Sequence, residues 1–164
     1  MNSLLTDYHY YLKFEKALSE NTIQAYERDL EKLNSYLSDF HVLLQDATIE
    51  LLRDFIIEIG SLGIHPRSQA RIISSISSFY RFLVYKNIIS TDPSELLESP
   101  KIGLRLPQIL SVEEIDAMIS AIDLSKPEGQ RNKAIIEVLY GSGVRVSELI
   151  NVKLSQLYLN EGYM

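Results

Sequence analysis

Residues 66–86 read PRSQARIISSISSFYRFLVYK, and they alternate apolar and polar side chains at the spacing of an α-helix. At about 100° per residue, one broad face carries the apolar side chains of Ile72, Ile73, Ile76, Phe79, Tyr80, Leu83 and Val84. The opposite face carries Arg67, Arg71, Ser74, Ser75, Ser78 and Arg81. Pro66 fits the first turn, where its missing N–H costs nothing. The stretch predicts one helix that packs into a core and presents a basic, serine-rich surface.

Three more helical segments precede this one. Residues 4–18 have apolar side chains at helical spacing, and Ser19 can cap a second helix that extends to about Leu37. A third helix is expected to begin after Asp46 or Thr48 and to end at Gly60, which can adopt the left-handed backbone of a helix C′ position.

A short helix from Thr91-Asp92-Pro93 to Glu98 would follow the basic helix. Four to five helices joined by short loops predict an all-α fold, a small helical bundle over residues 1–100.

Pro100 and Pro107 bracket a segment without amphipathic spacing, which predicts a linker at 101–107. Residues 108–164 then form a second unit that is expected to begin with helices. Ser111 to Glu114 and Ser125 to Glu128 have the spacing of capping boxes, and Gly141-Ser142-Gly143 is expected to break the second of these helices. This unit is near the lower size limit of a domain that folds by itself.

The composition is that of a globular protein, with 46% hydrophobic and 23% charged residues. The absence of cysteine excludes disulfides, zinc–thiolate sites and cysteine nucleophiles. The first residues match neither a secretory signal nor a membrane span, so we expect a cytoplasmic protein without a membrane partner. The net charge of −6 argues weakly against nucleic acid, but residues 67–86 contain four basic residues and no acidic one.

The basic face suits duplex DNA, because guanidinium groups one helical turn apart, with serines between them, can approach a line of phosphates closely. The alternative is an ordinary solvated helix face. Ser19-Glu20-Asn21-Thr22 likewise suits a phosphate at a helix N-terminus, although most such clusters are simple caps.

Other candidate sites are weaker. Arg145 and Glu148 have the spacing of an exposed i,i+3 ion pair, and the Gly-x-Gly before them lacks the strand and lysine of a phosphate loop. His9, His41 and His65 are far apart in sequence and have no acidic partner at metal-ligand spacing, so no metal site is expected.

A set of motifs in order along the chain resembles the Xer-type tyrosine recombinases of the phage-integrase family. They are residues 19–30 (SENTIQAYERDL), Ser68-Gln69-Ala70-Arg71, Asp92-Pro93, Pro100-Lys101, Leu106-Pro107, Leu110-Ser111, Arg131-Asn132-Lys133-Ala134 and residues 139–149 (LYGSGVRVSEL). The resemblance covers essentially the whole chain. It implies a SAM-like core-binding domain at 1–100 and the helical beginning of a mixed α/β catalytic domain at 108–164.

The resemblance also implies a function, site-specific DNA recombination, with duplex DNA and further recombinase protomers in a tetramer as partners and no cofactor or metal. It implies DNA contacts by the basic helix and by the start of the second helix, and the residues are Asn21, Thr22, Arg67, Ser68, Arg71, Ser74, Ser75, Ser78 and Arg81. Arg145 aligns with the first catalytic arginine of the family, and Glu148 aligns with an acidic neighbour that could orient it.

The family places its lysine hairpin, its His-x-x-Arg helix and its nucleophilic tyrosine later in the chain, and Tyr158 and Tyr163 come too early for the nucleophile. We therefore expect these 164 residues to bind DNA without cleaving it. Two alternatives remain open, a stand-alone DNA-binding module and an all-helical adaptor for proteins. Chromosome dimer resolution, as in chromosome partition during the cell cycle, and integration or excision of a mobile element are equally compatible with the sequence.

Overall fold

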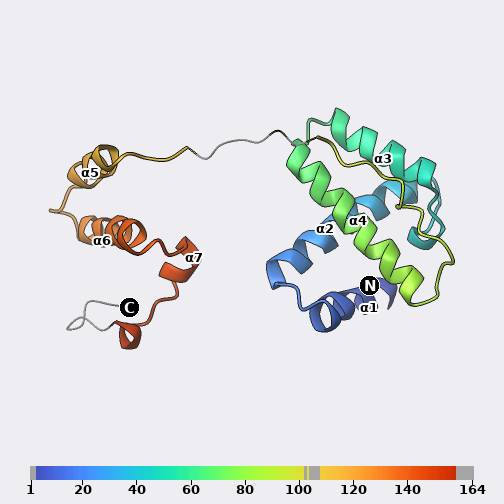
Figure 1. Ribbon diagram of the computed structural model, residues 1–164, viewed down its shortest axis with the longest axis horizontal. Helices are drawn as coiled ribbons and strands as arrows, with labels where there is room; N and C mark the ends of the chain where they lie inside the picture. Colours follow the sequence, from blue (N-terminus) through green and yellow to red (C-terminus); the bar gives the residue numbers. More distant parts are fainter. Residues whose placement is uncertain (1–2, 102, 104–107, 158–164) are drawn as a thin grey trace. The chain divides into compact units, whose positions relative to one another are not determined.

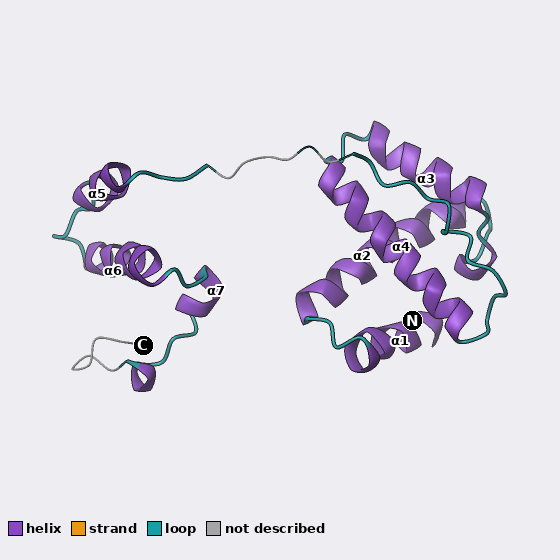
Figure 2. Cartoon of the chain, in the orientation of Figure 1, coloured by secondary structure: helices purple, strands orange, loops and turns teal. Residues whose placement is uncertain are grey.

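The computed structural model describes residues 3–101, 103 and 108–157, and this part of the chain is helical without strands, as expected (Figures 1 and 2). The chain divides into two compact units, Met1–Leu104 and Arg105–Met164. Residues 102 and 104–107 of the predicted linker, together with Tyr158 and Tyr163, lie outside the described residues. The domain boundaries at 100 and 108 therefore stay a prediction.

Four α-helices form the first unit. They are α1 (Ser3–Tyr10), which continues as the π-helical turn η1 (Tyr11–Glu15), α2 (Glu20–Asp39), α3 (Ile49–Ser61) and α4 (Pro66–Tyr85), with a 3-10 turn η2 (Leu44–Asp46) before α3. The predicted N-caps are confirmed, because Ser19 Oγ accepts a hydrogen bond from the Thr22 N–H and Thr48 Oγ1 accepts one from the Leu51 N–H. Pro66 occupies the first turn of α4 as predicted.

The core of this unit lies around α4, which crosses α2 in Figure 1 and also packs against α3. Its predicted inward face is largely confirmed, since Ile72, Ile76, Phe79, Tyr80 and Leu83 are buried. Phe82, which the helical spacing left off this face, is also fully buried. Tyr8 of α1 and Tyr11 of η1 cover it, with ring centroids 5.3 and 5.0 Å away. The N-terminal helix therefore widens the buried face of α4.

The end of α3 differs from the prediction. Gly60 lies inside the helix, and the C′ residue in left-handed backbone is Gly63, with φ of 74°. The Gly63 N–H bonds to the Gly60 carbonyl and the Ile64 N–H bonds to the Ile59 carbonyl, which is a Schellman motif. Gly60 and Gly63 could each have ended the helix, and the hydrogen bonds show that Gly63 does.

Replacing each of the two glycines with alanine should change the free energy of unfolding in opposite directions. Gly63→Ala should lower the free energy of unfolding by about 1–2 kcal/mol, because an L side chain is strained at this φ although nothing lies within 4 Å of the new Cβ. Gly60→Ala should raise it by about 0.5–1 kcal/mol, because a helix interior favours alanine and the nearest atoms, on Gln69, are 3.8 Å away. Chemical denaturation of both variants, followed by circular dichroism, measures the two values. Equal effects would contradict the assigned helix end.

The predicted helix from Thr91 to Glu98 is wrong, because residues 93–96 form turns. Asp92 Oδ1 accepts hydrogen bonds from the Ser94 N–H (2.8 Å) and the Ser94 hydroxyl (2.6 Å). This local capture of the backbone by an aspartate stabilises a turn instead of a helix start. The described residues of the bundle therefore form four α-helices, the lower of the two numbers expected.

The second unit contains α5 (Val112–Ser120), α6 (Pro127–Ser142), α7 (Val146–Leu149) and a 3-10 turn η3 (Leu154–Gln156). The Ser111 capping box is confirmed, since Ser111 and Glu114 exchange side chain to backbone hydrogen bonds. The predicted Ser125 capping box is wrong, because the Ser125 hydroxyl donates to Asp123 Oδ1 and α6 starts after Lys126.

The break after α6 also falls later than expected. Gly141 and Ser142 belong to the helix, and Gly143 alone, with φ of 66°, ends it. Across the described residues of both units, no helix combines the length and the apolar character needed to cross a bilayer.

Candidate nucleic-acid interface

A groove of about 370 Å³ lies on the first unit between the end of η1, the start of α2 and the polar face of α4. It is lined by Tyr11, Lys16, Leu18, Tyr26, Ile73, Ser74, Ser77, Ser78 and Arg81. Two cations, three serines and two tyrosines thus share one concave surface, which we call the serine groove.

The two cations of the serine groove come from different elements. Arg81 is exposed on α4, and Lys16 is exposed in the connection between η1 and α2, with its ammonium 5.5 Å from the centre of the Tyr11 ring. Left-handed backbone at Ala17 (φ 49°) turns the chain directly after Lys16. Within the described residues, no carboxylate lies within ion-pair distance of Lys16, Arg81 or Arg67. These three positive charges are available to an anionic partner.

The predicted DNA-contacting residues do not all lie together. Ser74, Ser78 and Arg81 line the serine groove. Arg67 is exposed and Ser68 is half-buried in the first turn of α4, outside the groove lining. At the start of α2, Asn21 is exposed and Thr22 is half-buried, with its N–H and hydroxyl both engaged by Ser19. These seven residues of the predicted set therefore lie in three places on the first unit, and Arg71 and Ser75 lie in a fourth, against Asp29 of α2.

Ser75 is a correction to the predicted surface. It is fully buried, and its hydroxyl donates to Asp29 Oδ2 at 2.8 Å and approaches the Arg71 carbonyl at 2.9 Å. The reason is tertiary, because α2 packs over this side of α4 and covers the position. Ser75 is a core residue that cannot reach DNA.

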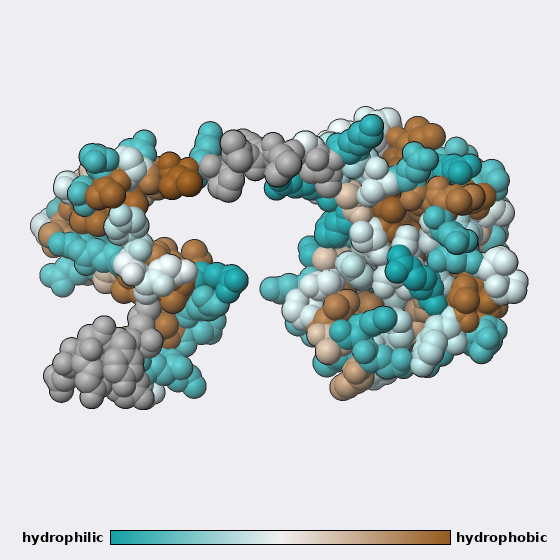
Figure 3. All heavy atoms as spheres, viewed as in Figure 1, coloured by the Kyte–Doolittle hydropathy of each residue, from teal (hydrophilic) through white to brown (hydrophobic). Residues whose placement is uncertain are grey.

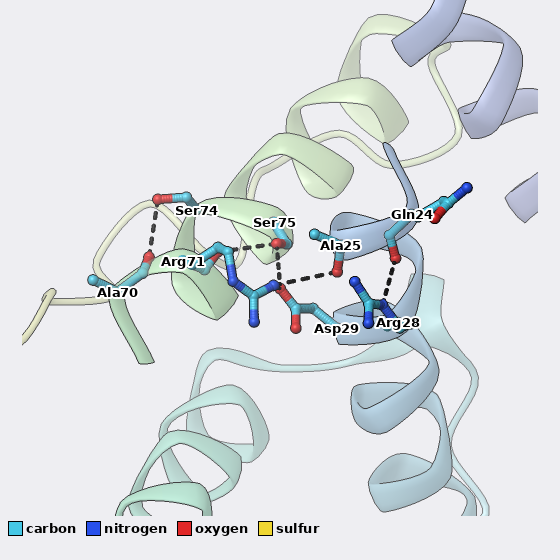
Figure 4. Close-up of polar contacts among 8 residues, drawn as sticks. All are labelled: Gln24, Ala25, Arg28, Asp29, Ala70, Arg71, Ser74 and Ser75. Carbon is cyan, nitrogen blue, oxygen red and sulfur yellow. Dashed lines mark hydrogen bonds and ion pairs between the residues drawn. The ribbon is translucent and has the colours of Figure 1, made fainter. Parts of the chain in front are cut away.

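Arg71 also contacts α2, and Figure 4 shows its guanidinium directed at Asp29 and at the Ala25 carbonyl. Asp29 is 1% exposed, whereas the side chain of Arg71 keeps 41% of its surface open to solvent. Burial raises the pKa of the Asp29 carboxyl, and the Ser75 hydroxyl and the charge of Arg71 oppose that rise. Asp29, Arg71 and Ser75, which we call the Asp29 cluster, join α2 to α4 through polar contacts.

Lys16 and Ser77 line the serine groove, and the helical pattern alone did not identify them as candidates. Lys16 comes from a part of the chain far from α4 in sequence, and only the packing of η1 beside α4 brings it to the serine groove. The sequence carried no local signal for this position, because residues 13–18 mix apolar and charged side chains.

Arg145 lies in the second unit at the start of α7. Its Nη1 donates to Glu148 Oε1 at 2.9 Å, and its backbone N–H donates to Glu148 Oε2 at 2.7 Å. These hydrogen bonds, with that from the backbone as the larger cause, lower the pKa of the Glu148 carboxyl. The Arg145 side chain is 82% exposed, so the predicted exposed i,i+3 ion pair is confirmed. The carboxylate holds one end of the guanidinium and leaves its other donors open.

No group of three potential metal ligands is found among the described side chains.

Two family models match the chain. The phage integrase N-terminal SAM-like domain matches residues 5–87, and the phage integrase family model matches residues 108–164. These two segments correspond to α1–α4 and to the second unit.

Curated relatives match over the whole length. Tyrosine recombinase XerD of Listeria innocua serovar 6a is 38% identical, and tyrosine recombinase XerD of Staphylococcus aureus strain Mu50 is 36% identical. Each alignment covers 100% of this chain and 56% of the relative, so the chain spans about half the length of these relatives.

Among solved structures, the integrase from mycobacterium phage Brujita has a similar fold. The TM-score is 0.57 at 19% identity, and the match covers 97% of this chain and 52% of that integrase.

Proposed function

Because the chain belongs to the phage integrase family, we propose that it is the DNA-binding part and the first catalytic segment of a tyrosine recombinase that performs site-specific recombination. The observation that carries the proposal is the serine groove, where Lys16 and Arg81 flank short hydroxyl side chains on the first unit. The matches to XerD proteins support the reaction class.

The serine groove fits a DNA backbone for physical reasons. Duplex DNA carries closely spaced phosphates, and lysine or arginine side chains that neutralise them release bound counterions. Small serine side chains let a phosphodiester approach α4 closely and can bond to its oxygens. Arg67, about two turns N-terminal to Ser74 on the same helix, extends the positive surface along α4. The net charge of −6 does not oppose binding, because these cations are concentrated on one surface.

Charge reversal tests the DNA-binding part of the proposal. The double variant Lys16→Glu and Arg81→Glu should bind a duplex roughly a hundredfold more weakly than the wild type at low salt, because two phosphate contacts become repulsive. The slope of the plot of log association constant against log salt concentration should decrease in magnitude by about two, one for each lost phosphate contact. Gel-shift titrations at several salt concentrations measure both values.

Arg53→Glu is the matched control. Arg53 is exposed on α3 and lines a different surface depression, together with Ile56 and Leu97. Its reversal should change the affinity several-fold at most, through long-range electrostatics. Equal losses for the control and for the groove variant would contradict the assigned surface. An absence of duplex retention by the wild type would instead favour an adaptor that binds proteins.

In the whole recombinase, Arg145 would donate hydrogen bonds to the phosphate oxygens that become more negative during strand cleavage, and Glu148 would orient the guanidinium. A planar fork of donors suits this task. The 164 residues alone would bind DNA without cutting it. Duplex DNA and partner protomers in a tetramer would be its partners, and recombination of chromosomal or mobile-element sites would take place in the cytoplasm.

The second unit offers support from its surface. Apolar side chains on or beside α5, α6 and α7 are exposed, and they include Ile109, Leu110, Val112, Met118, Tyr140, Val146 and Ile150. Figure 3 shows hydrophobic residues, in brown, on the surface of this unit. So many exposed apolar side chains on one small unit agree with further packing in a longer chain. In a recombinase of the relatives' length, these side chains would be covered by the rest of the catalytic domain.

A further inference from the structure

The Asp29 cluster is costly for a purely structural contact. The Asp29 carboxylate is almost fully buried, and its Oδ1 has no hydrogen-bond partner among the described residues. An ion pair with a buried carboxylate adds little to stability compared with apolar side chains of similar volume, because the desolvation of that charge opposes the attraction. The small gain in stability indicates that the cluster has a role besides holding α2 against α4.

The hydrogen bonds of Arg71 indicate that role. Its Nη1 donates to Asp29 Oδ2 and to the Ala25 carbonyl, the latter at 3.3 Å. Within the described chain, Nε and Nη2 have no recorded acceptor, and the side chain is 41% exposed. The protein thus holds the Nη1 end of the guanidinium. The opposite edge, formed by Nε and Nη2, has three N–H donors, and their side-by-side arrangement matches two oxygens of one phosphate.

The location of Arg71 agrees with its chemistry. Ser74, one turn further along α4, lines the serine groove, and Arg67 lies one turn before Arg71 on the same helix. A DNA backbone that follows α4 from the groove towards its N-terminus would therefore pass Arg71.

We propose that Asp29 is a positioning residue that holds the Arg71 guanidinium in place for a bidentate contact with a DNA phosphate, an inference that rests on the proposed function. A free arginine loses much rotamer freedom when it binds. Asp29 and the Ala25 carbonyl remove that freedom before DNA arrives, so less of the interaction is lost to ordering.

The proposal predicts an effect whose sign separates positioning from simple electrostatics. Asp29→Asn removes a negative charge from the DNA-binding unit, and a role through charge alone would make the variant bind DNA more tightly. A positioning role predicts weaker binding by roughly five- to tenfold, because the strong charged hydrogen bond that orients Arg71 is lost.

A double-mutant cycle of Asp29→Asn and Arg71→Gln, with duplex affinity measured by gel shift, tests the inference. Arg71→Gln alone should weaken binding roughly tenfold or more. Adding Asp29→Asn to Arg71→Gln should cause no further loss, because Asp29 acts through Arg71. Arg71→Gln leaves a buried carboxylate unpaired, so thermal melts accompany the titrations, and the double variant should regain stability without regaining affinity.

Asp54→Asn, a neutralised exposed aspartate on α3, is the matched control and should bind as tightly as the wild type or slightly more tightly. Two results would overturn this inference while leaving the proposed function intact. One is a loss of affinity in the double variant equal to the product of the two single losses, and the other is an Asp29→Asn affinity equal to that of the control. A wild-type chain that does not shift the duplex would overturn the proposed function and this inference with it.

Discussion

Phe79→Ala is expected to lower the free energy of unfolding of the first unit by about 3–5 kcal/mol, the range for removing a buried phenyl ring from a core. Phe79 is fully buried on α4, in edge-to-face contact with Tyr8 at 5.2 Å between ring centroids and beside Tyr80 at 5.5 Å. The rings come from α1 and α4, so the resulting cavity would loosen the contact between the first and the last helix of the bundle. A loss of this size approaches the whole stability of a small domain.

Denaturant titration followed by far-ultraviolet circular dichroism measures this effect, and the absence of tryptophan makes the helical signal the better probe. Phe14→Ala is the matched control. Phe14 is 71% exposed, so its removal should change the free energy of unfolding by no more than about 0.5 kcal/mol. Similar midpoints for the two variants would show that the rings around α4 are not the main source of stability.

Arg145→Ala is expected to slow DNA strand cleavage by about 10²- to 10³-fold, equivalent to about 3–4 kcal/mol, in a recombinase of the relatives' full length that contains this chain. The guanidinium would stabilise charge that develops only as the phosphate reacts, so the loss falls on the chemical step. Single-turnover cleavage of a suicide duplex substrate measures that step directly.

Duplex affinity of the same variant separates chemistry from binding. Arg145 does not line the serine groove, so the affinity should remain within a few-fold of the wild type. Arg145→Lys keeps the charge but not the planar fork, and it should remain well below the wild-type rate. Glu148→Gln should cost less than either, because it weakens the orientation of the arginine without removing it. A cleavage rate for Arg145→Ala close to that of the wild type would exclude the catalytic assignment.

Local features of the chain could be predicted because neighbouring residues determine them. Ser19, Thr48 and Ser111 cap helices as their short polar side chains indicate, and Pro66 starts α4. The Arg145–Glu148 pair also formed as its spacing predicts. In each case the interacting groups lie within four residues, so no distant part of the chain decides the outcome.

The errors have two physical causes, the packing of distant helices and the competition between local hydrogen bonds. Ser75 was expected on the surface and Phe82 was left off the core face, because helical spacing describes one inward face and α4 is covered by α2 and by the N-terminal helix from two sides. Ser125 and Asp92 used their side chains in local turns instead of helix caps. A sequence pattern does not show whether such a side chain caps a helix or bonds within a turn, because both hydrogen-bond partners are chemically suitable.

The sequence by itself determined the helical fold, the amphipathic α4 and the family, since periodicity, caps and ordered motifs are properties of consecutive residues. Only the tertiary structure decided which residues of the candidate interface come together. It brought Lys16 and Arg81 to the lining of one groove and buried Ser75. It also joined Asp29 to Arg71 across a separation of 42 residues. Contacts between distant segments depend on how helices pack, and packing is set by the whole core rather than by any one segment.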